Sequence, residues 1–401
     1  MSWLWVSPTS DFPVQNLPYG VFGRPGELRR IGVAIGGYVL DVATLSVAGL
    51  VGRPEWFVAR SLNTFMAAGR TAWSTTRAQL TEILTDPTFR PQVEPHLIPL
   101  TDVRMHMPFE VADYVDFYSS LEHATNLGRI FRPRGKPLMS NWRHLPIGYH
   151  GRAGTVVPSG TPVVRPSGQR KEADSDQPKF GPAQRLDFEA EVGFVVGVPS
   201  PMGTPVPTAD FLDHVFGVVL MNDWSARDIQ AWEYQPLGPF LSKSFATSIS
   251  PWVVTMEALE EARVDGPEQD PAPLPYLRRA PRSGLDLTLQ VSINGSVISH
   301  PPFAGMYWTL DQQLAHLTVN GSNLRTGDLY ASGTVSGPAP DQLGSLIEMT
   351  VNGAQPLTLP DGSRRTFLED ADIVTIKARA PGLEGARIGF GEVTGQVRRA
   401  R

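Results

Sequence analysis

The amino-acid sequence predicts a mainly β, α+β fold that is divided over more than one folding unit. The chain has 401 residues, which exceeds the usual size of a single domain. Glycine and proline contribute 38 and 37 residues, and turn formers at this density favour many short strands over long helices. Several segments alternate apolar and polar residues with period two, whereas helical patterns are few.

The N-terminal part is expected to open with a β-hairpin. Two strand-like runs, Ile31–Ile35 and Tyr38–Val42, are joined by Gly36-Gly37, and a Gly-Gly pair between apolar runs is typical of a tight hairpin turn. Helical patterns follow over residues 56–68 and 72–84. The part is nearly balanced in charge, with nine Arg and eight Asp or Glu up to residue 107.

Prolines at positions 87, 91, 95 and 99 are typical of a linker. We therefore place a domain boundary near residues 100–112, which divides the chain into domains 1–107 and 108–401. The second part is expected to form strands over residues 186–198, 215–221, 285–293, 371–378 and 388–397. Its expected helices cover residues 120–131, 225–234 and 310–317, and its expected polar loops cover residues 168–182 and 199–208.

Composition and motifs exclude several classes of function. The 35 Lys and Arg and 40 Asp and Glu give a formal net charge of −5, which argues against nucleic-acid binding. The chain contains no cysteine, which excludes disulfides, thiolate zinc sites, iron–sulfur clusters and cysteine nucleophiles. Glycine-rich nucleotide motifs, GxSxG and HExxH are absent from the sequence. The sequence contains no apolar run of 18 residues, and Met1–Trp5 does not start like a signal peptide, so we expect a cytoplasmic protein that binds no membrane.

Three acids share one face of the strand expected over residues 186–198. Period two places Asp187, Glu189 and Glu191 together, opposite a face of apolar side chains. Stacked carboxylates repel one another. They form either a solvated face or a hard-cation site, in which Glu189 and Glu191 coordinate the ion.

A second group of polar residues follows the apolar run at 215–221. Asp223 stands at the end of this expected strand, where an acid either serves an active site or caps the next helix, and Ser225 is a plausible N-cap. One face of that helix carries a guanidinium, an amide and a phenol, from Arg227, Gln230 and Tyr234. Lys243, one of only five lysines, follows in a rigid apolar loop.

A third group lies around the helix expected at 120–131. Ser119 and Glu122 fit a capping box. His123 shares an apolar helix face and is either a core residue or a functional one, leaning with Asp116 toward one pocket. Glu348 lies in an apolar run far along the chain, where a buried acid needs a partner, and a histidine is one candidate.

These residues fall in long specific segments, among them DFYSSLEHATNLGRIFR at 116–132, RLDFEAEVGFVVG at 185–197 and FGVVLMNDWSARDIQAWEYQPLGPFLSKSF at 216–245. With further segments up to RIGFGEVTGQV at 387–397, they run in order through the whole chain, which resembles the fumarylacetoacetate hydrolase family. The resemblance implies a small N-terminal SH3-like β-barrel domain, a large C-terminal mixed β-sandwich roll with the active site, and a homodimer. It also implies hydrolysis of 4-fumarylacetoacetate to fumarate and acetoacetate, the last step of tyrosine and phenylalanine catabolism.

The resemblance further implies roles for individual residues. The expected ligands of a Ca²⁺ or Mg²⁺ are Asp116, Glu189, Glu191 and Asp223. A second cation is expected near Asp223, Lys243 and Thr247. His123 would be the base, oriented by Glu348. The groups expected to stabilise oxyanion charge are Arg227, Gln230 and Lys243, and those expected to hold the substrate are Tyr118, Arg132, Tyr149, Gln230, Tyr234 and Thr334.

Two alternatives remain at this point. Acylpyruvases, oxaloacetate decarboxylases and hydratases of the wider superfamily share the carboxylate–metal core, but they are usually shorter and lack the N-terminal domain. A β-domain with a purely structural Ca²⁺ would have no need of the set formed by His123, Arg227, Gln230 and Lys243.

Overall fold

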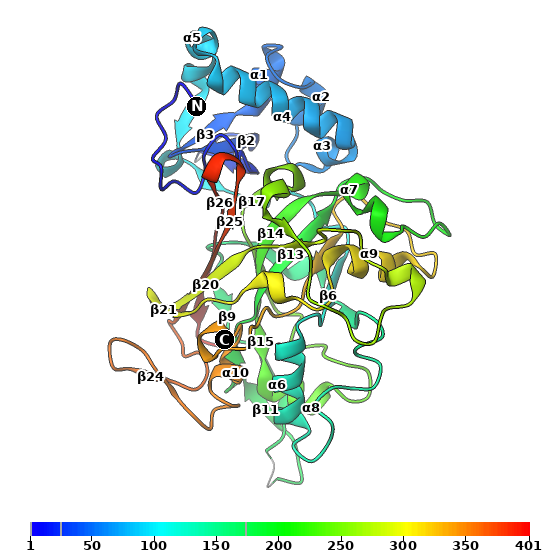
Figure 1. The fold of residues 1–401 in the computed structure, drawn as a ribbon. Coiled ribbons are helices and arrows are strands. Elements are labelled where there is room, and N and C mark those ends of the chain that lie inside the picture. The colour runs from blue at the N-terminus through cyan, green and yellow to red at the C-terminus, as the bar shows by residue number, and fades with distance from the viewer. Residues whose placement is uncertain (1, 25, 173–174) are drawn as a thin grey trace.

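A computed structural model of the protein describes residues 2–24, 26–172 and 175–401. It confirms a strand-rich mixed fold, in which an N-terminal domain lies at one end of a larger C-terminal domain (Figure 1). No helix in these described residues is long and apolar enough to cross a membrane.

The N-terminal domain combines four antiparallel strands with short helices. The strands run in the order β4-β3-β2-β1, with bounds β1 (Tyr19–Gly23), β2 (Arg30–Ile35), β3 (Tyr38–Asp41) and β4 (Leu97–Pro99). The helices are α1 (Val42–Val47), α2 (Pro54–Phe57), α3 (Asn63–Ala67), α4 (Arg70–Thr85) and α5 (Arg90–Val93). They gather on the side of these strands that faces away from the C-terminal domain (Figure 1).

The hairpin and the second helix of this domain are confirmed. Ile35 pairs with Tyr38 across the glycine turn, where Gly36 has a φ of 57° that glycine adopts without steric cost. The helix expected over residues 56–68 is broken, because α2 ends at Phe57 and α3 starts only at Asn63. The linker expected over residues 87–99 is wrong: its prolines start short helical turns, and β4 then pairs with β3.

The N-terminal strands continue into the main sheet of the C-terminal domain. The order is β4-β3-β2-β1-β17-β14-β13-β22-β6-β7, and this sheet is open among the described residues rather than closed as a barrel. The C-terminal members of this run are β6 (Tyr114–Phe117), β7 (Gly148–His150), β13 (Ala190–Val196), β14 (Val215–Asp223), β17 (Trp252–Thr255) and β22 (Leu329–Ala331). Three short strands attach at its side, β5 (Arg104–Met105), β8 (Val156–Pro158) and β16 (Thr247–Ile249).

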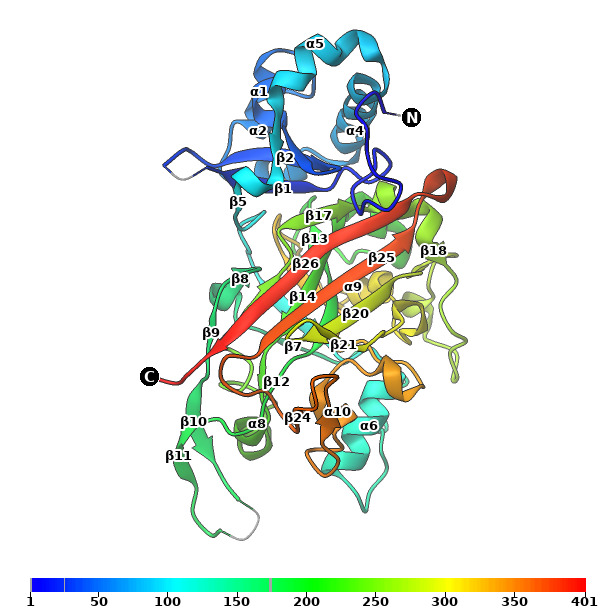
Figure 2. The same cartoon turned by 90° about the vertical axis from the view of Figure 1, so that its left-hand side faces the viewer.

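A second sheet packs across this one, as Figure 2 shows with β25 and β26 crossing in front of β13 and β14. Its order is β21-β20-β25-β26-β9, with bounds β9 (Val163–Val164), β20 (Thr288–Ile293), β21 (Ser296–Ser299), β25 (Ile373–Pro381) and β26 (Arg387–Arg398). Apolar side chains of both sheets, such as Phe194, Leu220, Ile376 and Val393, form one buried core between them. The strands predicted over residues 215–221, 285–293, 371–378 and 388–397 are therefore confirmed as β14, β20, β25 and β26.

The helices of this domain are α6 (Leu121–Phe131), α7 (Phe211–His214), α8 (Arg227–Glu233), α9 (Leu310–Thr318) and α10 (Leu346–Met349). Three of them, α6, α8 and α9, confirm the helices predicted at 120–131, 225–234 and 310–317. The segment 168–182, expected to be a polar loop, has a strand at each end. These strands, β10 (Ser167–Arg170) and β11 (Lys179–Pro182), pair as an antiparallel hairpin. Residues 173–174 of that expected loop lie outside the described residues.

An aromatic cluster joins the two domains. Phe216 of β14 is buried, and its ring centroid lies 5.7, 5.6 and 5.2 Å from those of Tyr19, Phe65 and Trp73. These three partners come from β1, α3 and α4 of the N-terminal domain. Pairs of aromatic rings at such distances add to the free energy of burial.

We expect Phe216→Ala to lower the free energy of unfolding by about 3–5 kcal/mol, the usual cost of removing a buried phenylalanine. Guanidinium unfolding followed by tryptophan fluorescence measures this loss. The control is Phe180→Ala on β11, where 78% of the side chain is exposed and removal should leave the midpoint unchanged. Equal midpoints for Phe216→Ala and the parent would show that the cluster does not stabilise the fold.

Candidate active site

Four buried carboxylates meet at one end of the main sheet. Asp116 comes from β6, Glu191 from β13 and Asp223 from the last position of β14, while Glu189 lies directly before β13. One oxygen of each lies within 4.8 Å of the others, and each residue is at most 5% exposed. We refer to these four residues as the carboxylate cluster.

The cluster fits a divalent cation. Both carboxylate oxygens of Glu191 and Oδ1 of Asp116 are buried and have no hydrogen-bond partner among the described residues. Burial, followed by the neighbouring carboxylates, raises the pKa of Glu191 and of Asp116 well above the usual range. A cation between the four groups would favour their ionised forms, and an all-oxygen ligand set suits a hard ion such as Ca²⁺ or Mg²⁺.

Two cationic side chains flank the cluster. Lys243 Nζ lies 2.7 Å from Asp223 Oδ2 and also contacts Glu189, and Arg227 Nη1 lies 2.7 Å from Glu189 Oε1. Burial opposes the ionisation of Glu189, but Lys243 and Arg227 outweigh it and hold the pKa of this carboxyl below its ordinary value. Glu189 is therefore charged, and the site contains fixed positive groups beside the cluster.

Two hydroxyl groups complete the surroundings of the cluster. Tyr149, on the neighbouring strand β7, donates a hydrogen bond of 2.7 Å to Asp116 Oδ2. Thr247 stands opposite Asp223 in the pairing of β16 with β14, and its hydroxyl donates to Asp223 Oδ1 at 3.0 Å. The antiparallel registers thus bring both groups to the cluster.

Asp187 does not share the face of Glu189 and Glu191, contrary to the alternation expected over residues 186–198. The strand is interrupted after β12 (Leu186–Asp187), and β13 starts only at Ala190. β12 pairs with β15 (Ser225–Ala226) instead of β14, which turns the Asp187 carboxylate to Arg227 Nε at 2.9 Å. The period-two argument fails here because it assumes an unbroken strand.

His123 and Glu348 form a buried pair. His123 Nδ1 lies 2.7 Å from Glu348 Oε2, across 225 residues of sequence. Burial opposes the ionisation of Glu348, but His123 and several hydrogen bonds outweigh it and lower the pKa of this carboxyl. When the ionised carboxylate accepts the proton of Nδ1, the other ring nitrogen, Nε2, is the basic one.

The helix α6 positions His123. Its N-cap is Ser120 rather than the expected Ser119, and the Ser120 hydroxyl accepts a hydrogen bond from the His123 backbone at 3.1 Å. The N-cap expected at Ser225 is also displaced, because α8 begins at Arg227 after Ala226. Neither difference moves a functional side chain to another face.

The predicted residues line one cavity of about 390 Å³. Its wall includes Asp116, Tyr118, His123, Arg132, Tyr149, Glu189, Arg227, Gln230, Tyr234, Lys243 and Thr334. The remaining predicted residues lie behind this wall. Glu191 and Asp223 complete the carboxylate cluster. Thr247 donates a hydrogen bond to Asp223, and Glu348 pairs with His123. Arg227 Nη2 and Thr334 Oγ1 are buried and have no partner among the described residues, so both can bind a ligand in the cavity.

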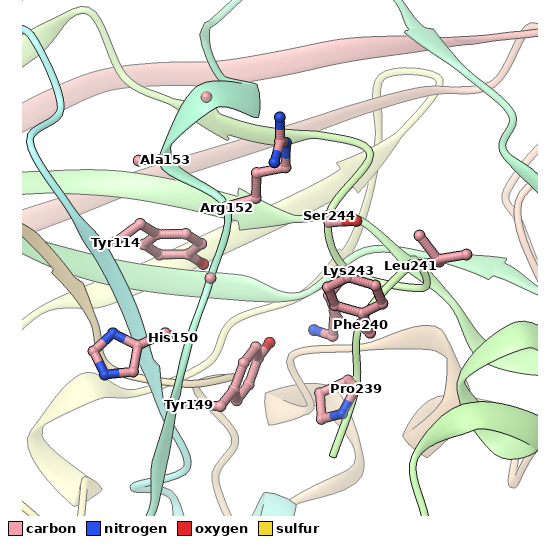
Figure 3. A pocket seen from close by; sticks show the side chains of 12 residues that line it. Tyr114, Tyr149, His150, Arg152, Ala153, Pro239, Phe240, Leu241, Lys243 and Ser244 are labelled. Atoms are coloured by element: carbon pink, nitrogen blue, oxygen red, sulfur yellow. The ribbon is translucent and has the colours of Figure 1, made fainter. Parts of the chain in front are cut away.

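A second cavity of about 510 Å³ adjoins the first (Figure 3). Tyr114, Tyr149, His150 and Ala153 line its left side in that view, and Pro239, Phe240, Leu241, Lys243 and Ser244 line its right side. Tyr149, Pro239 and Lys243 line both cavities and thus form the wall between them. The cluster residues Asp116 and Glu189 line only the first cavity.

Sequence reasoning missed the other partners of Glu348. Its carboxylate also accepts hydrogen bonds from Asn126, Ser336 and Ser345, at 3.0, 2.9 and 2.7 Å. These residues lie on separate segments, and no periodic pattern marks them. The only signal for them was the rule that a buried carboxylate needs donors.

Comparison with known proteins gives matches over nearly the whole chain. Two family models match the chain, "Fumarylacetoacetate (FAA) hydrolase C-terminal" over residues 113–398 and "Fumarylacetoacetase N-terminal" over residues 15–108. Proteins named fumarylacetoacetase from Homo sapiens and Caenorhabditis elegans are each 48% identical, over 99% of this chain and 98% of theirs. A fumarylacetoacetate hydrolase structure from Exiguobacterium antarcticum matches with a TM-score of 0.57 at 19% identity, covering 96% of this chain and 100% of that one, which shows a shared fold.

We expect Glu191→Gln to abolish most of the stabilisation that a divalent cation gives. The variant replaces a buried acid whose two oxygens have no hydrogen-bond partner among the described residues, so its metal-free form should melt at or above the melting temperature of the metal-free parent. Ca²⁺ or Mg²⁺ at 100 times its Kd should stabilise the parent by about 2.7 kcal/mol. Thermal unfolding after dialysis against EDTA measures both effects.

The matched control is Glu392→Gln, which removes a half-exposed carboxylate of β26 that pairs with Lys377. This variant should gain as much stability from the cation as the parent. An equal gain for Glu191→Gln would exclude Glu191 as a ligand.

Proposed function

The chain belongs to the fumarylacetoacetase family, and we propose that it hydrolyses the carbon–carbon bond of 4-fumarylacetoacetate to give fumarate and acetoacetate. One structural observation supports this proposal. The carboxylate cluster and the His123–Glu348 pair adjoin the same cavity, so a cation and a general base can act on one ligand.

We propose Ca²⁺ or Mg²⁺ as the cation, held by Asp116, Glu189, Glu191 and Asp223, with a second cation near Asp223, Lys243 and Thr247. A bound divalent cation supplies Lewis-acid stabilisation of the enolate that departs when a β-diketone is cleaved. The charges support the first of these cations, because four carboxylates and one divalent cation sum to −2, which Lys243 and Arg227 bring to neutrality. A neutral centre of this kind avoids the large cost of an uncompensated buried charge.

His123 acts as the general base. Its Nε2 takes a proton from water, whose oxygen forms a bond to the carbonyl carbon next to the fumaryl group. Glu348 fixes the tautomer through Nδ1 and supports the imidazolium that forms. Three further donors hold the Glu348 carboxylate, so it keeps its orientation while the ring gains and loses charge.

Arg227, Gln230 and Lys243 stabilise the negative charge that develops on the attacked carbonyl oxygen. One well-placed donor is typically worth about 3–4 kcal/mol in the transition state. Collapse of the tetrahedral intermediate breaks the carbon–carbon bond, and its electron pair stays on the departing carbon. That carbon takes up the proton from His123, which yields acetoacetate beside fumarate.

The remaining cavity residues hold the two ends of the substrate. Arg132 offers a cation for a terminal carboxylate, and its guanidinium is oriented by a hydrogen bond of 2.6 Å to the carbonyl of Pro137. The hydroxyl-bearing side chains that complete this set are Tyr118, Tyr149, Tyr234 and Thr334. Tyr118 packs edge-on against the His123 ring at 5.4 Å between centroids, so a substrate that touches it lies close to the base.

The substrate indicates the metabolic pathway to which the reaction belongs. Fumarylacetoacetate hydrolysis is the last step of tyrosine and phenylalanine catabolism. We propose a cytoplasmic homodimer in which residues 108–401 form the catalytic domain and residues 1–107 the N-terminal domain. The numbering of the site supports this division, because all of its residues lie between Asp116 and Glu348.

The purified protein should consume fumarylacetoacetate, with loss of the diketone absorbance and formation of fumarate and acetoacetate identified by NMR. Dialysis against EDTA should abolish turnover, and Ca²⁺ or Mg²⁺ should restore it, because the cation stabilises the leaving enolate. Absence of turnover with metal-loaded protein would contradict the proposed function. Full turnover by protein shown to be metal-free by elemental analysis would contradict its metal dependence.

His123→Gln should lower kcat by about 10²- to 10⁴-fold, the usual effect of losing a general base. Glu348→Gln should have a smaller effect, and the double variant should lose little beyond His123→Gln because the two residues act as one unit. Steady-state kinetics, with circular dichroism and metal content as checks on folding, measures these losses. Losses that multiply in the double variant would show that the pair does not work as base and orienting group.

The control for the histidine change is His316→Gln on α9, since this half-buried histidine does not line the active-site cavity. Its kcat should remain within a factor of about two of the parent value.

A further inference from the structure

Asp187 is a fully buried acid with four hydrogen-bond donors around it. Its Oδ2 accepts from Arg227 Nε at 2.9 Å and from the Ile347 backbone at 3.0 Å. Its Oδ1 accepts from the backbones of Leu346 and Phe188, both at 2.8 Å. One carboxylate thus joins the strand β12, the side chain of Arg227 and the start of α10.

Two of the groups that Asp187 holds, the side chain of Arg227 and the start of α10, belong to or adjoin residues of the proposed reaction. Arg227 is held at Nε by Asp187 and at Nη1 by Glu189 and by Gln230 at 3.1 Å, which leaves Nη2 as the donor for a ligand. Leu346 and Ile347 are the two residues directly before Glu348 on α10. The carboxylate that orients the base is therefore attached to a turn whose first two N–H groups are fixed by Asp187.

We propose that Asp187 is a positioning residue that couples the oxyanion-binding guanidinium of Arg227 to Glu348, the acid that orients the base. This inference rests on the proposed function. It assigns Asp187 neither to the cation nor to the substrate, since Asp187 lines no part of the cavity and is not one of the clustered carboxylates.

The physical reason lies in the geometry that the reaction demands. A guanidinium without its Nε partner would be attracted further toward Glu189, and a displaced Arg227 would carry Nη2 away from the developing oxyanion. The same loss would leave the N–H groups of Leu346 and Ile347 buried without acceptors, which favours a different path for α10. Both effects weaken the transition state more than the binding of substrate.

The test is Asp187→Asn, which keeps the size of the side chain and removes the charge. We expect kcat per folded site to fall by about 10- to 100-fold, as for residues that orient the groups in direct contact with a reaction centre. KM should change less than threefold, because the substrate-holding residues Arg132 and Tyr234 do not contact Asp187. Thermal unfolding and metal content are measured on the same samples.

Asp372→Asn is the matched control. Asp372 is also buried, accepts two hydrogen bonds of 2.9 Å from Arg365 and one from the Glu369 backbone, and lines no part of the cavity. This variant should lose stability and keep its kcat. If Asp187→Asn behaves in the same way, with lower stability and normal kcat, Asp187 has a structural role only and the inference is wrong.

A double-mutant cycle with Arg227→Met separates coupling from general damage. The loss in kcat caused by Asp187→Asn should be several-fold smaller in the Arg227→Met background, where one of the four donors to Asp187, Arg227 Nε, is already gone. An equal loss in both backgrounds would overturn the coupling to Arg227.

Should Asp187→Asn fail to fold, Asp187→Glu keeps the charge but extends the side chain, and it should lower kcat at least fivefold. A normal kcat for this variant would equally overturn the inference. The kcat of the parent protein is the reference for all variants. If the parent did not turn over fumarylacetoacetate, that result would contradict the proposed function itself.

Discussion

Mutual repulsion among four buried carboxylates is the constraint on which the rest of this structure depends. A buried negative charge without compensation is costly, and here four of them share one end of a sheet. Lys243 and Arg227 offset two charges, and a divalent cation can offset the remaining two. The second sheet supports this arrangement from behind, because it buries the apolar faces of β13 and β14 and so fixes the strands that carry Glu191 and Asp223. A bound divalent cation would therefore stabilise the site, which links the fold to the proposed chemistry.

The cation alone does not explain the site, because a structural ion needs no base. His123 lines the same cavity, and its buried partner Glu348 is joined to the cluster through Asp187 and Arg227. This chain of contacts runs from the carboxylate that orients the base to a proposed metal ligand, Glu189. A purely structural cation site would have no use for it. The proposed base, oxyanion donor and cation ligand are therefore linked by direct contacts.

Local patterns predicted much of the fold and of the site, and they failed where distant segments decide the structure. The hairpin at Gly36-Gly37 and the strands β14, β20, β25 and β26 follow from turn chemistry, alternation and, for β14, a continuous apolar run, which are patterns of a few residues. The proline-rich stretch at 87–99 looked like a linker, but pairing of β4 with β3 placed it inside the N-terminal domain. The face of Asp187 depended on the pairing of β12 with β15, which no local period encodes. The same limit holds for Ser336 and Ser345, which meet the His123–Glu348 pair only through the tertiary fold.

The most direct test of the central claim is a crystal structure with Ca²⁺ and an anomalous difference map recorded at long wavelength. The account predicts a strong peak between Asp116, Glu189, Glu191 and Asp223, with oxygen atoms of all four at roughly 2.3–2.6 Å. It also predicts that this peak borders the cavity lined by His123. A well-ordered site without a peak, or a calcium ion bound elsewhere while the four carboxylates remain without one, would contradict the account.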